Sequence, residues 1–228
     1  MRNNVNEDLL ASRAKWARTL SFGGLGCLIA AVVLVNRELY LAWAILTLGL
    51  VVSTSGAYLA TRYIREPRAE QALAKALSGF DDHHVLYNFL LPEEHVLVTP
   101  SGVWVILVKK QPGELSYDGR KWRRKFTLSR LFGLLGEPGL GNPIRELNRD
   151  VSGLSERIAH ALGGTEVPVE GVIVFTDPGA RIDIKRTACP VVTVDNLRSF
   201  FRRELKNRPA IDPEVWKALV GVLDNWAG

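Results

Sequence analysis

Two side chains that can do chemistry lie near each other on two predicted neighbouring strands. Residues 92–110 read as two strands joined by a tight turn at 100–102, with Glu94 near the start of the first strand and Lys109 near the end of the second. Side chains two apart in a strand point the same way, so Lys109 shares a face with Leu107. A carboxylate and an ammonium group placed like this form either an ordinary ion pair across the strands or part of a polar site.

A run of basic residues around one tryptophan is the strongest charge feature of the chain. It lies in a predicted hairpin that turns at Asp118 and Gly119. Such a run can grip a phosphate backbone, lie against anionic lipid headgroups, or form a solvated rim of the hairpin. The residues concerned are Arg120, Lys121, Trp122, Arg123, Arg124 and Lys125.

The bulk composition suits one ordinary domain with an additional element. The chain has 228 residues and a formal net charge of +5, which hints at an anionic partner or a membrane surface without establishing either. The two cysteines, Cys27 and Cys189, are far apart in the sequence and give neither a disulfide framework nor metal-ligand spacing.

Two uncharged apolar runs near the N-terminus, residues 20–35 and 39–60, predict a pair of transmembrane helices. We expect a cytoplasmic segment at 1–18 and a transmembrane hairpin at 19–62. Basic residues flank both outer ends and only Arg37 lies in the turn, so the positive-inside rule places both termini and the soluble domain in the cytoplasm of a multi-pass protein. A signal peptide and a buried soluble hairpin are the alternatives. Small residues at 49, 53 and 57 predict close packing, either between the two helices or in a dimer.

The remainder of the chain predicts an α/β domain over residues 63–208, followed by an amphipathic helix at 209–228. Residues 103–108 are apolar on both faces, which favours a central strand covered on both sides. Asn142 and Pro143 begin a helix, 169–175 and 191–194 read as strands, and Asp195 and Asp212 precede two further helices. The last helix either packs on the domain or binds a partner.

This order of elements resembles the nuclease-related domain (NERD) family over residues 65–205. The resemblance is specific in the acid-His-Val strand at 94–96, in the Gly-Val-x-Val-Ile strand at 102–106 and in Asn142-Pro143. It implies a restriction-endonuclease-like mixed sheet flanked by helices, here preceded by the two-helix transmembrane hairpin. It also implies a divalent-metal-dependent DNA endonuclease activity, with Mg²⁺ as the cofactor if the site is active.

The same resemblance assigns the candidate site. Glu70 matches the helix acid of the family, Glu94 matches the strand acid, and Lys109 is the lysine of a Glu-x-Lys motif, so these three are the candidate catalytic residues. Glu70 and Glu94 are the candidate metal ligands. Leu107 replaces the Glu of the motif, and Glu146 stands where the family often has Gln.

Three functions compete on these grounds. The leading one is a membrane-anchored, catalytically degenerate domain that binds nucleic acid or another partner. The alternatives are an active DNA endonuclease with Glu146 as a substitute ligand, and a module that binds anionic lipid. Ordinary structural roles stay open as well, with Glu70 as a solvated helix residue and residues 81–84 (Asp-Asp-His-His) as a polar loop rather than a metal site.

Overall fold

The computed structural model describes all residues except 120, 125–138, 185–186 and 207. Contacts divide the chain into two compact units. One comprises residues 1–6, 69–125 and 140–228, and the other comprises residues 7–68 and 126–139. Each unit is described separately below.

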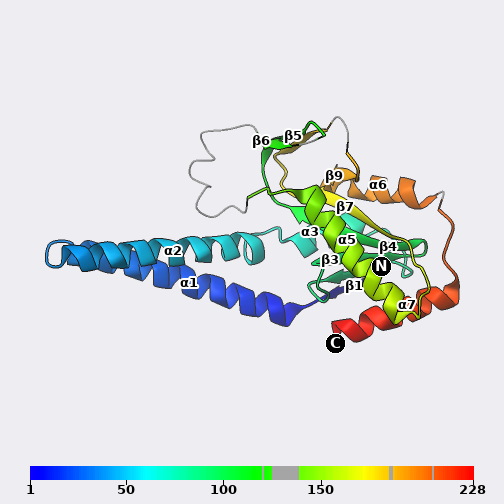
Figure 1. The fold of residues 1–228 in the computed structure, drawn as a ribbon, viewed down its shortest axis with the longest axis horizontal. Helices are drawn as coiled ribbons and strands as arrows, with labels where there is room; N and C mark the ends of the chain where they lie inside the picture. Colours follow the sequence, from blue (N-terminus) through cyan, green and yellow to red (C-terminus); the bar gives the residue numbers. More distant parts are fainter. Residues whose placement is uncertain (120, 125–138, 185–186, 207) are drawn as a thin grey trace. The chain divides into compact units, whose positions relative to one another are not determined.

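The larger unit contains a six-stranded mixed sheet in the order β1-β2-β3-β4-β7-β9 (Figure 1). The antiparallel pairs are β2 with β3 and β3 with β4, whereas β1 with β2, β4 with β7 and β7 with β9 are parallel. The strands are β1 (Arg2–Val5), β2 (Val85–Asn88), β3 (His95–Thr99), β4 (Gly102–Lys109), β7 (Val169–Phe175) and β9 (Val191–Thr193).

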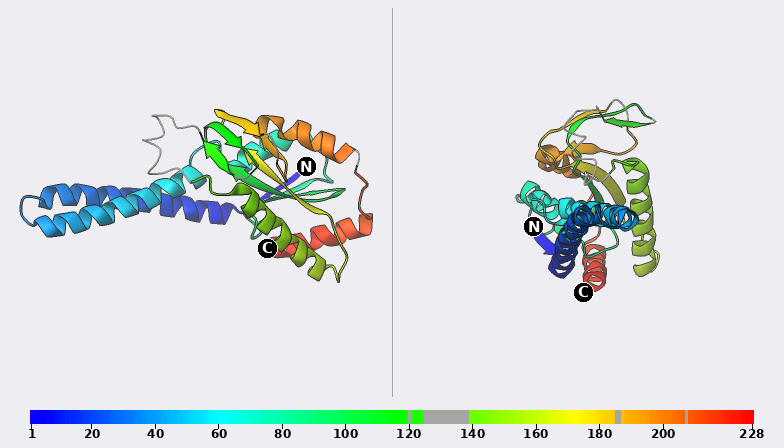
Figure 2. Two further views of the ribbon diagram at one scale, coloured as in Figure 1. Left: turned by 45° about the horizontal axis from the view of Figure 1, so that its top comes forward. Right: turned by 90° about the vertical axis from the view of Figure 1, so that its left-hand side faces the viewer.

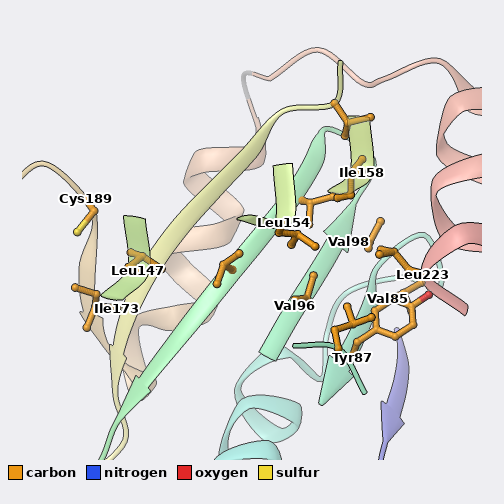
Figure 3. Packing of buried hydrophobic residues seen from close by; sticks show 14 of the residues in the cluster. Val85, Tyr87, Val96, Val98, Leu147, Leu154, Ile158, Ile173, Cys189 and Leu223 are labelled. Carbon is orange, nitrogen blue, oxygen red and sulfur yellow. The ribbon is translucent and has the colours of Figure 1, made fainter. Parts of the chain in front are cut away.

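Two layers of helices cover the two faces of this sheet. Residues Val103 and Val105 of β4 belong to one apolar cluster together with residues of α5 (Pro143–Ala161) and α7 (Pro213–Ala227) (Figure 3). Trp104 and Ile106 belong to a second cluster, with residues of α3 (Ala69–Leu77) and α6 (Val194–Lys206). Burial of β4 on both faces confirms the predicted central strand.

A second, three-stranded sheet has the order β6-β5-β8. The predicted hairpin forms from β5 (Gly113–Tyr117) and β6 (Trp122–Arg124), with Gly119 at a φ of 95° in the turn. The sequence analysis did not predict β8 (Ala180–Ile184), which pairs in parallel with β5. Leu115 is fully buried in the same apolar cluster as α5, so the inner face of this sheet extends the main core.

The smaller unit is a helical hairpin of α1 (Glu7–Leu34) and α2 (Leu39–Tyr63), which lie side by side in both views of Figure 2. The buried positions recur every seven residues and most of them are small: Leu10, Ala17, Gly24 and Ala31 on α1, and Ala42, Gly49 and Gly56 on α2. A Cβ on Gly24 would lie 2.5 Å from the backbone nitrogen of Ser53. Gly49 and Ser53 therefore pack the two helices together, and Gly56 rather than Ala57 continues the contact.

The N-terminal boundary of the hairpin differs from the prediction, whereas α2 ends at Tyr63, one residue beyond the predicted end at 62. Helix α1 begins at Glu7, well before the apolar run, and residues 2–5 form strand β1 of the main sheet rather than a free segment. Residues 209–228, predicted as a separate helix, lie in the same compact unit as the sheet. Leu219 and Leu223 of α7 are fully buried in the core (Figure 3 labels Leu223).

Candidate functional site

Lys109 lies at the end of β4, and its ammonium group forms an ion pair with a carboxylate from α5. The distance from Lys109 Nζ to Glu146 Oε2 is 2.7 Å, and only 12 % of the lysine side chain is exposed. The start of α5 places this carboxylate, because Asn142 caps the helix by accepting from the amide of Arg145. In the first helical turn, Glu146 also interacts favourably with the helix dipole.

Leu107 lies on the same face of β4 as Lys109, two residues earlier. It faces Ile173 of β7 in the parallel register and packs against the apolar cluster beneath α5. On the other side, β3 pairs with β4 up to Val96 and Val105, and Glu94 lies two residues before Val96. The face of β4 that carries Lys109 is therefore aliphatic at position 107.

Glu94 immediately precedes β3 and is half-buried. Its carbonyl oxygen accepts a hydrogen bond of 2.7 Å from the amide of Phe89, at the end of β2. This bond closes the connection between β2 and β3 and places Glu94 at the start of β3.

Glu70 lies in the first turn of α3 and is buried, with 4 % of the residue exposed. The alternative of a solvated helix residue is therefore wrong. Leu73 and Leu77 of the same helix pack on the face of the sheet opposite to that of Leu107 and Lys109. The structure thus joins Lys109 to Glu146, whereas Glu70 belongs to the helix layer on the other face.

The basic hairpin adjoins this end of the sheet through Trp122. The Trp122 ring lies 6.1 Å from the Phe175 ring, and Phe175 is the β7 residue paired with Lys109. The Tyr117 ring also packs against the indole, with 5.0 Å between ring centroids. Trp122 is therefore an anchor of the hairpin in the core rather than a fully exposed stacking surface.

Two charged members of the basic run lie on the surface of the hairpin. Lys121 and Arg123 are exposed, and Arg123 lies 3.4 Å from the carboxylate of Asp118. Only the backbone of Arg124 is placed, in β6, while Arg120 and Lys125 lie outside the described residues.

One comparison with known proteins identifies the domain that carries these residues. Residues 65–176 match the family model of the nuclease-related domain, NERD. This part of the chain is a nuclease-related domain. The match covers just under half of the chain and runs from the end of the hairpin through β7, so it includes Glu70, Glu94 and Lys109. Neither the search of the curated proteins nor that of the solved structures found a match.

The candidate site of the nuclease-related domain offers few oxygen donors for Mg²⁺. Mg²⁺ requires near-octahedral oxygen coordination, usually from carboxylates and water. Within the described part of the chain, no group of three or more His, Cys, Asp or Glu side chains converges. Leu107 supplies no oxygen, and Glu146 binds the Lys109 ammonium. These residues do not fit a Mg²⁺ site.

Residues 81–84 form a turn beside the nuclease-related sheet. Asp81 Oδ1 lies 2.7 Å from His84 Nδ1 and also accepts from the amide of His83. The hydrogen bond to His84 is the main cause that lowers the pKa of Asp81. These contacts account for the polar side chains as turn stabilisers, in line with the polar loop that the sequence favoured.

The outer face of the three-stranded sheet holds an open cleft of about 620 Å³ that sequence reasoning missed. Its polar lining consists of two basic residues, two acidic residues and a serine: Arg123, Arg181, Glu114, Asp183 and Ser116. The alternation of residues 180–184 is the signal for β8 that the sequence carried. Among the described residues that line the cleft, the two positive and two negative charges offset each other.

Proposed function

We propose that the chain is a membrane-anchored nuclease-related protein whose site is catalytically degenerate and which binds nucleic acid or another partner at the cytoplasmic face of the membrane. The observation that carries this proposal is the surroundings of Leu107. This side chain stands at the acid position of the family motif and packs into the apolar cluster beneath α5. It cannot bind a metal, and its partly buried aliphatic side chain makes this face less favourable for the water that a nuclease must place there.

The ion pair beside Leu107 supports the same conclusion. A metal-bound carboxylate contributes several kcal/mol to the transition state, so its loss lowers the rate by orders of magnitude. In this chain the lysine that would orient water or phosphate is held 2.7 Å from Glu146. Its positive charge is thus largely neutralised within the protein.

The surface of the hairpin supports insertion into a membrane. Only 17 % of the most apolar window of each helix is buried, so neither α1 nor α2 resembles the core helix of a soluble protein. Their small residues face each other, while large apolar residues such as Phe22, Ile29, Val33 and Leu48 are exposed. Helices of 28 and 25 residues are about 42 and 38 Å long, enough to cross an apolar layer of about 30 Å.

Strand β1 supports placing both ends of the hairpin on one side of that membrane. It precedes α1 and pairs with β2, which follows α2. A cleavage that removed α1 as a signal peptide would also remove a strand of the sheet. Basic residues gather at the ends that join the sheet (Arg13, Lys15, Arg18, Arg62, Arg65 and Arg68), which favours the cytoplasmic side.

Active metal-dependent cleavage is the second candidate function, because Glu146 lies beside Lys109. In this alternative Glu146 of α5 replaces the acid that the family carries at position 107 of β4, and its carboxylate lies within reach of Lys109. The third candidate, binding of anionic lipid, draws on the exposed Lys121 and Arg123 of the basic hairpin.

The deciding experiment is plasmid cleavage in Mg²⁺ or Mn²⁺ by the full chain in lipid nanodiscs. The full chain is needed because a version that starts at residue 65 lacks β1. We compare the unchanged chain with Leu107→Glu and with Leu107→Glu/Glu146→Gln, which restores the family pattern. Lys109→Ala in the restored background is the control.

We expect no cleavage by the unchanged chain and metal-dependent cleavage by the double variant, lost again with Lys109→Ala. Cleavage by the unchanged chain that is abolished by a chelator, by Lys109→Ala and by Glu146→Gln would replace our proposal with the second candidate. DNA affinity that falls steeply with salt in neutral nanodiscs supports nucleic-acid binding. Binding of the nanodisc-embedded full chain to separate vesicles that rises with their anionic-lipid content, and is lost with Lys121→Ala/Arg123→Ala, favours the third candidate.

A further inference from the structure

Phe89 has a backbone conformation that a non-glycine residue rarely adopts. It follows β2 and has a φ of 58°, the single positive value at a non-glycine residue in the described part of the chain. The left-handed region costs an aromatic residue about 1 kcal/mol or more, so neighbouring contacts must hold it. Such positions often lie beside functional groups, and this one closes the connection that carries Glu94.

Hydrogen bonds from two directions hold the backbone of Phe89. Its amide donates to the carbonyl of Glu94 at 2.7 Å. Its own carbonyl accepts from the side-chain amide of Asn6 at 3.1 Å. The backbone amide of Asn6 donates to the carbonyl of Asn88, also at 3.1 Å, so Asn6 spans the turn from both sides.

A second row of side chains fastens the same turn to β1. The buried Asn88 donates through its amide nitrogen to Asn3 Oδ1 at 2.8 Å, and its amide oxygen lies 2.8 Å from His95 Nδ1. The ring of His95 packs edge-on against Phe89, with 4.9 Å between centroids. His95, the residue after Glu94, is thus tied to β1 through Asn88, whereas Glu93 on the other side pairs with Arg157 of α5.

We propose that Asn6 is a positioning residue for Glu94 and that it links the candidate site to the membrane hairpin. Asn6 is followed directly by Glu7, the first residue of α1, with no spacer. The other end of the hairpin leads into α3, whose first turn carries Glu70. Both candidate acids therefore depend on segments that emerge from the two ends of the hairpin.

The side chain of Asn6 has a role beyond pairing β1 with the sheet. The β1–β2 ladder pairs residues 2–5 with residues 85–88, and side-chain bonds from Arg2 to Tyr87 and from Asn88 to Asn3 reinforce it. The bond from Asn6 Nδ2 to Phe89 lies beyond that ladder and acts on the turn itself. The inference rests on the proposed function only in treating Glu94 as a site residue, and its test requires neither binding nor cleavage.

The test is amide hydrogen exchange, read by NMR on the full chain in lipid nanodiscs, with two variants that change one atom each. Asn6→Asp keeps the shape of the side chain but removes the donor to Phe89. Asn3→Asp is the matched control on the same strand, because it keeps the oxygen that accepts from Asn88. A lost hydrogen bond of about 1 kcal/mol corresponds to roughly fivefold faster opening.

We expect the Phe89 amide to exchange about fivefold faster in Asn6→Asp, with the amides of β7 unchanged, and to be unaffected in Asn3→Asp. Restoration of slow exchange by Asn6→Gln, which regains a donor, would support the positioning role. Equal effects of the two Asp variants, or a rise across the whole sheet including β7, would overturn it. Asn6 would then serve only the general stability of the fold. None of these results depends on whether the proposed site cleaves or binds DNA.

Discussion

A single added methyl group at Gly171 tests how tightly α5 holds the site. Gly171 lies in β7, paired with Val105, directly beneath the side chain of Leu147. A Cβ built there would lie 2.6 Å from Leu147 Cγ and 2.7 and 2.8 Å from its two methyl carbons. Leu147 is 1 % exposed, so it has no free space to enter and α5 must shift.

Overpacking of this kind costs about 1–3 kcal/mol. At about 2–4 °C per kcal/mol for a domain of this size, Gly171→Ala should lower the midpoint of thermal unfolding by about 4–8 °C for a cost near 2 kcal/mol. Glu146 precedes Leu147, so the same shift should weaken its ion pair with Lys109. The assay is thermal unfolding of the full chain in detergent, followed by tryptophan fluorescence.

The compensating variant is Leu147→Ala, which alone should cost about 2–5 kcal/mol by leaving a cavity. In the double variant the new methyl group fills part of that cavity, so the combined cost should be smaller than the sum by about 1 kcal/mol or more. Gly221→Ala is the control, because the space around Gly221 in α7 is open and alanine is favoured in a helix. Strictly additive costs, or a neutral Gly171→Ala, would refute the close contact between α5 and β7.

Three further outcomes follow from individual contacts. Burial is the main cause that raises the pKa of Tyr87. The contribution of Tyr87 to the free energy of unfolding should therefore be complete below the unfolded-state pKa of about 10 and decline as the pH rises above it. Tyr87→Phe should reduce the dependence of the melting temperature on pH between about pH 8 and 11. The bond to His84 lowers the pKa of Asp81, so the carboxylate's contribution to the free energy of unfolding is present above pH 3.8 and lost as the pH falls below that value. Asp81→Asn should reduce this dependence in an acid titration followed by circular dichroism. In the membrane hairpin, Gly24→Leu should force α1 and α2 apart because its Cβ would clash with the backbone of Ser53. Gly23→Leu is the control, because the space around Gly23 is open. Cysteine cross-linking between α1 and α2 in nanodiscs should fall in the first variant and not in the second.

Local patterns made much of the fold predictable. The doubly apolar run at 103–108 identified the central strand, Asn142 and Pro143 identified the start of α5, and the long apolar runs identified the hairpin. Each of these signals lies within a few consecutive residues. Sequence periodicity therefore predicted these elements well.

Features that depend on distant parts of the chain were not predictable in the same way. Strand β1 consists of Arg-Asn-Asn-Val, which has no apolar alternation, and its partner lies some eighty residues away in the sequence. The partner of Lys109 is on a helix, and no local pattern could distinguish Glu146 from Glu94. Glu70 lies three and seven residues before Leu73 and Leu77, so helical spacing places it on the buried face of α3 although its charge favours solvent.

The position of β1 imposes an order on biosynthesis. Its partner strand is made only after both apolar helices, so residues 2–5 must wait through the synthesis of the hairpin before they can pair. In the proposed membrane-anchored form, a chain that crossed the membrane an odd number of times would leave β1 and β2 on opposite sides and the sheet with an unpaired edge. Such an edge at β2 exposes backbone groups, and incompletely folded chains are triaged by chaperones and proteases.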